Sequence, residues 1–292
     1  MNLSIDTIII NIIGCLHSII YNKSELIMTE EILKKIKQLP PLPESAMQIE
    51  AVYQDPDSTF NDMVKILEKD PLLTADILKA ANSPLYGFSR EINAISQAVG
   101  LFGMGTVRGF ALASIVKKSF TLDLTPYGIT NDMFSALSKK QHALMTSWCL
   151  RKENKLLGVL SPAAFLVEIG KALIAQQIIT DNKQEEFRDA LLELQDVEAA
   201  EREVVGVDTP EVSATIFAQW KFEEGLVDVI RNCQNPEKAE DDDKRAAKIL
   251  NVVRVAVPIN GVITDESINK AKELIEKYEL DMPSFEKALE TF

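Results

Sequence analysis

The sequence predicts an all-α protein built from many short helices. From Thr29 onward, apolar residues recur every three to four positions, which places them on one face of a helix. No convincing run alternates apolar and polar residues as a half-buried strand would. Of the 292 residues, 46% are hydrophobic and 26% are charged, a composition that supports a large buried core in one large or two modest domains.

Prolines and capping residues set the limits of the first helices. A helix that begins near Thr29 ends at the segment LPPLP, Leu39 to Pro43, because proline lacks the amide hydrogen and clashes with the preceding turn. A second helix is expected over about Glu44 to Tyr53. A third follows a Ser58 cap, with four apolar residues facing inward: Phe60, Met63, Val64 and Leu67.

The next helix has the clearest start and stop signals in the chain. Asp70 is expected to cap its N-terminus, and Pro71 suits its first position because the proline φ angle is already helical. The helix should end near Asn82, since asparagine tolerates left-handed geometry and Pro84 prevents continuation.

The central and C-terminal parts are also expected to be helical. The stretch from Ile92 to Phe120 reads as two apolar helices broken at Gly103 and Gly105, and its all-round apolarity predicts a central position. The run EDDDKR at 240–245 reads as a solvated helix start. The remaining expected helices are Asp132 to about Lys152, Pro162 to about Ile179, Asp181 to Ala200, Pro210 to Trp220, Gly225 to Asn232, Ser267 to Tyr278 and Ser284 to Leu289.

Charge and cysteine content exclude several functional classes. The formal charge of −13 repels polyphosphates, so nucleic acid and anionic membranes are not expected partners. Cys15, Cys149 and Cys233 are odd in number and lack metal-type spacing, which suits a reducing cytoplasm and packing roles. No motif predicts a cofactor.

The N-terminal stretch from Ile5 to Ile20 is apolar but does not predict a membrane anchor. It carries Asp6, Asn11 and His17 and is too short to span a bilayer. The first positive charge, Lys23, comes after the apolar run, unlike in a secretory signal. Residues 1–28 are therefore an N-terminal appendage of uncertain role, or upstream sequence before a translation start at Met28.

Three motifs in order carry a resemblance to a known family: LPPLP, KDPLLTADILKAANSPLYG (Lys69 to Gly87) and AVGLFGMGTVRG (Ala98 to Gly109). Together they resemble the HDOD family, the HD-related output domains of bacteria, over about residues 30–220. The resemblance implies an HD-like helical bundle with an N-terminal subdomain. The expected divisions are residues 29–125 for that subdomain, 126–235 for a degenerate HD-like subdomain and 236–292 for C-terminal helices.

The resemblance also implies that a metal site has been lost. Catalytic HD-domain phosphohydrolases hold metal ions with several His and Asp ligands, and this chain has only two histidines, His17 and His142. The positions that match the ligands of those enzymes are His142, Val167, Glu168 and Thr209, with later ones near Asn232, Cys233 and Val257. At best His142 and Glu168 survive, so no metal and no catalytic residues are expected.

Two functions of different classes follow. The first is a non-catalytic signal-transduction module, in some relatives linked to motility, that binds a partner protein or small ligand in a groove between the two subdomains. The groove candidates are Asp70, Asn82, Ser83, Tyr86 and Gly103, although helix capping and close packing explain most of them equally well. The alternative is a residual phosphohydrolase acting on nucleotides or cyclic dinucleotides through His142 and Glu168.

Overall fold

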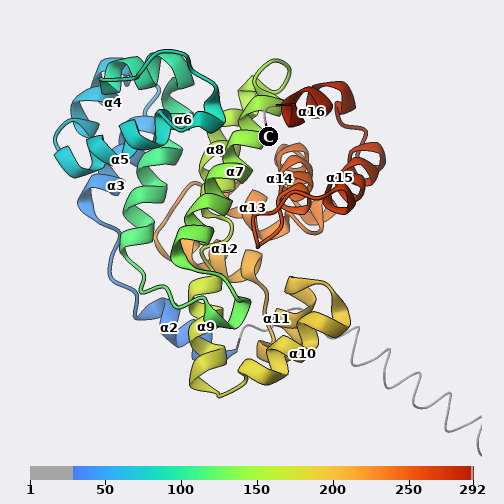
Figure 1. Ribbon diagram of the computed structural model, residues 1–292. Helices are drawn as coiled ribbons and strands as arrows, with labels where there is room; N and C mark the ends of the chain where they lie inside the picture. The colour runs from blue at the N-terminus through green and yellow to red at the C-terminus, as the bar shows by residue number, and fades with distance from the viewer. Residues whose placement is uncertain (1–28, 291) are drawn as a thin grey trace, which may run out of the picture.

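The computed structural model describes residues 29–290 and 292 (Figure 1). The expectations for residues 1–28, including Cys15 and His17, lie outside this part of the chain. Within it the structure is helical and contains no strand, which confirms the predicted all-α class.

The N-terminal helices gather at one end of the molecule, with α3 to α6 side by side (Figure 1). The exception is α2, which packs against α9 and α12. Their bounds are α2 (Glu30–Lys37), α3 (Glu44–Gln54), α4 (Phe60–Leu67), α5 (Pro71–Ala81), the 3₁₀ helix η1 (Pro84–Tyr86) and α6 (Ile95–Lys118).

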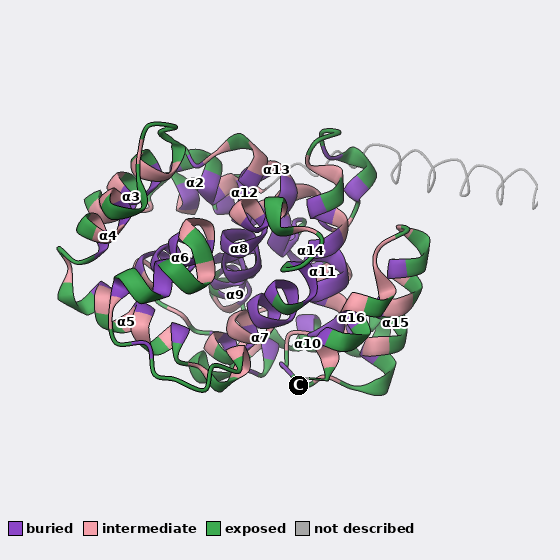
Figure 2. Ribbon diagram, turned by 90° about the horizontal axis from the view of Figure 1, so that it is seen from above, coloured by how far each residue is buried: buried purple, intermediate pink, exposed green. Residues whose placement is uncertain are grey.

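The remaining helices surround α8, which is almost entirely buried (Figure 2). The bounds are α7 (Asn131–Cys149), α8 (Leu157–Leu166), α9 (Lys171–Thr180), α10 (Gln184–Leu194), α11 (Val197–Val205), α12 (Thr209–Gln219), α13 (Glu224–Asn232), α14 (Lys244–Ala256), α15 (Asp265–Lys277) and α16 (Met282–Leu289). Short 3₁₀ helices connect them: η2 (Thr125–Tyr127), η3 (Asn154–Leu156) and η4 (Pro236–Lys238).

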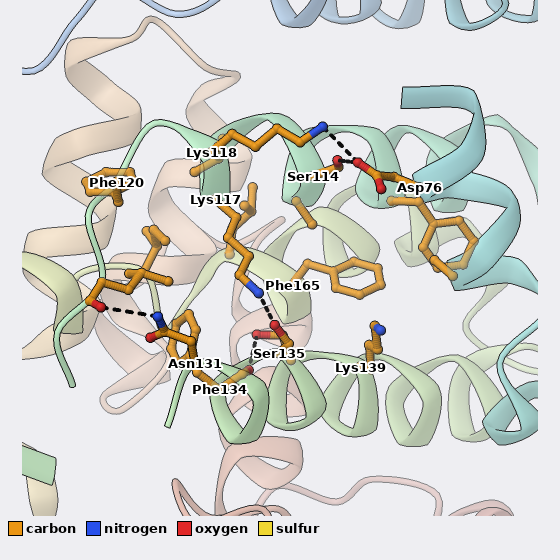
Figure 3. Close-up of a pocket in the computed structure, with 18 of the residues that line it drawn as sticks. Asp76, Ser114, Lys117, Lys118, Phe120, Asn131, Phe134, Ser135, Lys139 and Phe165 are labelled. Atoms are coloured by element: carbon orange, nitrogen blue, oxygen red, sulfur yellow. Dashed lines mark hydrogen bonds and ion pairs between the residues drawn. The ribbon is translucent and has the colours of Figure 1, made fainter. Parts of the chain in front are cut away.

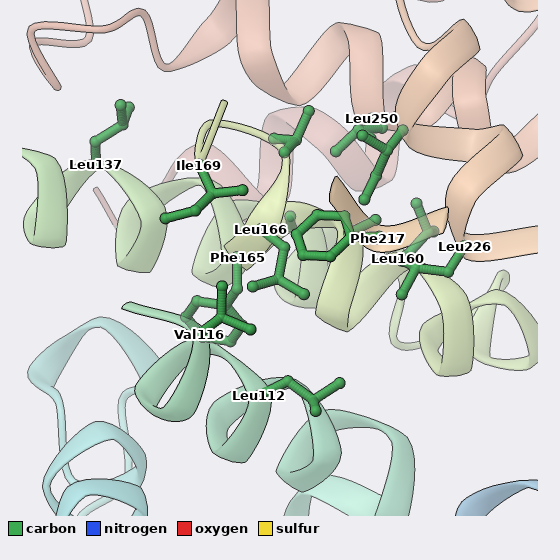
Figure 4. Close-up of a cluster of buried hydrophobic side chains, with 14 of the residues drawn as sticks. Leu112, Val116, Leu137, Leu160, Phe165, Leu166, Ile169, Phe217, Leu226 and Leu250 are labelled. Carbon is green, nitrogen blue, oxygen red and sulfur yellow. The ribbon is translucent and has the colours of Figure 1, made fainter. Parts of the chain in front are cut away.

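One continuous core joins the N-terminal helices to the rest of the fold. Phe165 and Leu166 of α8 lie between Val116 of α6 on one side and Phe217 of α12 on the other (Figure 4). Burial of these large side chains supplies most of the stabilisation, at roughly 25 cal/mol per Å² of apolar surface removed from water.

The start of α4 differs from the sequence-based expectation. Its cap is Thr59 rather than Ser58, because the Asp62 carboxylate accepts hydrogen bonds from the Thr59 amide at 3.0 Å and hydroxyl at 2.6 Å. The Asp62 carboxylate, three residues after the cap, thus satisfies the Thr59 amide as in a capping box. Phe60, expected to face inward, is 37% exposed.

Two helices predicted as continuous are each divided. The predicted helix from Asp181 to Ala200 becomes α10 and α11, which separate at Gln195 in the left-handed region with φ 51°. The predicted helix from Pro162 to Ile179 becomes α8 and α9. Between them, the Ser213 hydroxyl of α12 accepts a hydrogen bond from the Gly170 amide and donates one to the Val167 carbonyl.

Glycines shape α6 in two different ways. Gly103 takes a non-helical conformation with φ 79°, which confirms the predicted break at this residue. Gly105 stays helical and instead permits close packing, because a Cβ there would lie 2.9 Å from the Cα of Gly158 at the start of α8. The predicted break at Gly105 is therefore wrong.

Two helical segments are long and apolar enough to cross a membrane by composition alone, Ile95–Lys118 and Asn154–Thr180. Within the fold, 56% and 89% of their most apolar windows are buried. Their apolarity is explained by their place in the core, since α6 and α8 pack on each other.

Candidate functional site

The division between α8 and α9 places the Glu168 carboxylate in the protein interior. Lys171 Nζ lies 2.8 Å from Glu168 Oε2, and Arg254 Nε of α14 donates to Glu168 Oε1 at 2.8 Å. Glu198 and Glu201 of α11 complete the group: Glu198 pairs with Arg254, and Glu201 lies 3.4 Å from Lys171. These five residues are called the charge cluster below.

Neutral donors complete the hydrogen bonding around Glu201. The Tyr127 hydroxyl donates to Glu201 Oε1 at 2.8 Å, and the amide and hydroxyl of Thr209 donate to its two oxygens at 2.6 Å each. Lys171 also donates to the Thr209 hydroxyl at 3.0 Å. The charges of this buried region are thus held by fixed partners from α9, α11, α12 and α14.

The charge cluster shifts the ionisation of its members. Burial alone would raise the pKa of Glu168, but Arg254 and Lys171 hold it well below the usual range. Burial alone would lower the pKa of Lys171, but Glu168, Glu201 and Glu198 raise it above its ordinary value. For Glu201 burial dominates and raises the pKa to about 7. Glu168 and Lys171 are therefore both charged at neutral pH.

Three of the positions that match metal ligands, Glu168, Thr209 and Cys233, contact members of the charge cluster, but their contacts do not fit a metal ion. Glu168 and Thr209 are bound by Lys171, and Arg254 Nη1 lies 3.6 Å from the Cys233 sulfur. Lys171 and Arg254 already bind the two oxygens of the Glu168 carboxylate, each at 2.8 Å. Their positive charges would repel a divalent ion placed at the same carboxylate. Within residues 29–290, no group of three or more His, Cys, Asp or Glu side chains is arranged to hold a metal.

The structure does not bring His142 to Glu168. Its Nδ1 lies 2.7 Å from the Tyr86 hydroxyl and its Nε2 lies 2.8 Å from the Ser161 hydroxyl, while the ring stacks on Phe165 with centroids 4.0 Å apart. The side chain that reaches Glu168 from α7 is the preceding one, Gln141, whose Nε2 lies 3.3 Å from Oε1. Neighbouring helix residues point about 100° apart, so one step in sequence selects a different environment.

The buried position of His142 predicts a pH-dependent stability. Burial lowers its pKa from 6.5 to about 3, so between these values the folded protein binds fewer protons than the unfolded chain. The contribution of the neutral imidazole is therefore complete above pH 6.5 and is lost as the pH falls. Relative to His142→Gln, wild-type stability should fall by about 1.4 kcal/mol per unit below about pH 6.

Urea denaturation of both proteins at about pH 7, 6 and 5 measures this difference. Glu201, with its raised pKa, acts in the opposite direction in this range, but it titrates in both proteins and cancels in the comparison. A difference that stays constant with pH would contradict the buried neutral state of His142.

The five predicted groove residues have local structural contacts. Asp70 Oδ1 accepts hydrogen bonds from the amides of Leu72 and Leu73 at 3.0 Å, which confirms the expected cap. The Asn82 side chain joins the end of α5 to Ile92, donating to its carbonyl and accepting from its amide at 2.8 Å each. Ser83 precedes η1, Tyr86 contacts His142, and Gly103 forms the bend of α6.

A cavity of about 610 Å³ lies between these N-terminal helices and the following ones, where the groove was expected (Figure 3). Its walls come from α5, α6, α7 and the end of α8, so the five predicted groove residues do not line it. Phe110 and Phe165 form part of an apolar wall, and lysines of α5, α6 and α7 lie at its rim. We call this space the groove cavity.

Comparisons with known proteins agree with this architecture. A family model described as HDOD domain matches residues 39–236. Among curated proteins, an uncharacterized protein of Treponema pallidum (strain Nichols) is 30% identical over 77 residues, which is 26% of this chain and 15% of that protein. The matched segment therefore spans under a sixth of that relative.

Solved structures share the fold over nearly the whole chain. A candidate phosphohydrolase from Shewanella amazonensis SB2B is 24% identical, with a TM-score of 0.68 and coverage of 90% of this chain and 94% of that one. A virulence factor from Campylobacter jejuni subsp. jejuni is 25% identical, with a TM-score of 0.53 and coverage of 88% and 93%. An HDOD domain protein of unknown function from Geobacter sulfurreducens is 16% identical, with a TM-score of 0.61 and coverage of 92% and 99%.

Proposed function

The chain belongs to the HDOD family, and from that premise we propose that it is a non-catalytic regulatory module of signal transduction. It acts in the cytoplasm by binding a partner protein or a small ligand in the groove cavity, and motility is the first output to examine. The cavity combines an apolar wall with charged, hydroxyl and amide side chains, and such a combination is typical of binding sites.

The observation that carries this proposal is where the groove cavity lies. Asp76 of α5 and Lys117 of α6 face Ser135 of α7 across it, so an occupant would contact the N-terminal helices and the HD-like part together (Figure 3). Binding that favours one arrangement of these two parts over another shifts the population between them. A ligand or partner seated there can therefore regulate the surface presented elsewhere.

The charge cluster argues against the residual phosphohydrolase. Metal-assisted hydrolysis needs carboxylate and imidazole ligands free to bind an ion and activate water. Here Glu168 is held by Lys171 and Arg254, while His142 lies between Tyr86, Ser161 and Phe165. These contacts engage both residues on which a hydrolytic mechanism would depend.

A variant in which a larger side chain fills the groove cavity tests the regulatory role in cells. Ala113, half-buried on α6, lines the cavity, so Ala113→Phe should exclude an occupant. In the organism that encodes the chain, we expect this variant to reproduce the deletion strain in swimming motility and in global protein abundance. The matched control, Ala51→Phe, makes the same change on α3 at an exposed residue that does not line the cavity.

Both variants must show wild-type circular dichroism and thermal midpoints for this comparison to count. A folded Ala113→Phe protein that restores the wild-type state to the deletion strain would remove the groove cavity from the mechanism. A control variant that also fails would mean that the phenotype reports protein abundance rather than binding.

A further inference from the structure

Lys117 and Lys139 line the groove cavity, and neither forms an ion pair with a carboxylate among the described residues. Lys117 of α6 donates to the Ser135 hydroxyl, and Lys139 of α7 forms no ion pair or hydrogen bond within residues 29–290. Both ammonium groups point into the space between the two helices (Figure 3). By contrast, Lys118 at the same rim pairs with Asp76 at 2.8 Å.

The electrostatics of this pair favour an anion. Burial lowers the pKa of Lys117 and the charge of Lys139 lowers it further, whereas the Asp132 carboxylate, which also lines the cavity, raises it. The chain carries 44 acidic side chains against 31 basic ones, so carboxylates are abundant on it. The groove cavity is lined by four lysines (Lys79, Lys117, Lys118 and Lys139) and two aspartates (Asp76 and Asp132). The positive charges outnumber the negative ones, so the local potential is positive and an anion would be stabilised there.

The walls of the groove cavity specify the rest of the ligand. Phe110 and Phe165 present aromatic rings with centroids 5.4 Å apart, and both side chains are more than nine-tenths buried. The volume of about 610 Å³ falls in the range of small-molecule sites, about 300–1,000 Å³. An apolar or aromatic body can therefore pack against the rings while its charged end meets the lysines.

We propose that the groove cavity binds a small organic phosphate, with the phosphate between the Lys117 and Lys139 ammonium groups and the body against Phe110 and Phe165. A phosphate carries close to two negative charges at neutral pH and matches two ammonium donors better than a single carboxylate does. This inference rests on the proposed function, because it names the ligand class of the same groove.

Calorimetric titration of the full-length protein tests the proposal with 1-naphthyl phosphate as the probe. We expect one site per chain, with 1-naphthol binding at least about 10-fold more weakly because it lacks the charge-assisted hydrogen bonds. Lys117→Gln and Lys139→Gln should each weaken binding of 1-naphthyl phosphate by about 10-fold, and added salt should weaken it further.

Lys65→Gln is the matched control, because it removes the same charge from an exposed residue of α4 that pairs with Asp62, far from the cavity lining. Its affinity for 1-naphthyl phosphate should equal that of the wild type. Equal affinity for 1-naphthol and 1-naphthyl phosphate would overturn the proposal, and so would unchanged affinity in both cavity variants or no detectable binding.

The two experiments separate this inference from the proposed function. If Ala113→Phe abolishes regulation but 1-naphthyl phosphate does not bind, the ligand class is wrong and the groove serves another occupant. If 1-naphthyl phosphate binds in a lysine-dependent way but Ala113→Phe leaves the cells unchanged, the phosphate site is supported and the regulatory role is contradicted.

Discussion

Replacing Lys171 with methionine should lower the free energy of unfolding by about 3–5 kcal/mol, because three buried carboxylates then share one remaining cation, Arg254. The Lys171 side chain is 1% exposed and faces Glu168 at 2.8 Å, Glu201 at 3.4 Å and Glu198 at 3.7 Å. Methionine keeps most of the side-chain volume, so the loss reports charge rather than a cavity. Chemical denaturation at neutral pH measures the change.

A second substitution tests whether uncompensated charge is the cause. Adding Glu201→Gln to Lys171→Met removes one of the stranded carboxylates, so the double variant should recover part of the lost stability. The control is Lys65→Met, which removes an exposed lysine that pairs with Asp62. It should change the free energy of unfolding by about 0.5 kcal/mol at most. A Lys171→Met protein as stable as this control would show that the charge cluster contributes nothing.

The sequence shows why this cluster could be foreseen only in part. Helix limits depend on local signals, so the Asp70 cap and the LPPLP corner were predictable from a few adjacent residues. Glu168 and Lys171 also leave a local signal, as charged residues inside an otherwise apolar stretch. Their partners do not, because Arg254 lies 86 residues from Glu168 and only the fold brings the two side chains together.

The residues of the groove cavity could also be predicted only in part from the sequence. The sequence predicts a groove between the N-terminal helices and the HD-like part, but the candidate residues lie at the two ends of α5, in η1 and at the bend of α6, away from the cavity walls. The role of Asn82 is structural, because its side chain forms two hydrogen bonds with the backbone of Ile92. Lys117 and Lys139 belong to two separate helices, α6 and α7, and nothing local in the sequence predicts that they share a cavity.

Arg108 is the second residue whose replacement should have a large effect. Its side chain is fully buried, and its guanidinium donates to the two Glu50 oxygens at 2.7 and 2.8 Å. It also donates to the Gly158 carbonyl at 3.2 Å and lies 4.2 Å from the Tyr53 ring centre. Its Nη2 also lies 3.2 Å from Glu223 Oε2 at the start of α13. One side chain thus connects α3, α6 and α8 with the start of α13, which explains the arginine in the sequence GTVRG.

We expect Arg108→Met to lower the free energy of unfolding by about 3–5 kcal/mol, because Glu50 is left buried and unpaired. Since Glu50 belongs to α3, local opening should start there, and backbone amides of α3 should lose more hydrogen-exchange protection than those of α14. Adding Glu50→Gln should recover stability. The control, Arg245→Met, breaks a pair whose arginine side chain is 47% exposed and should cost about 1 kcal/mol or less. Uniform loss of protection across both helices would contradict a local role for Arg108 at the junction of α3, α6 and α8.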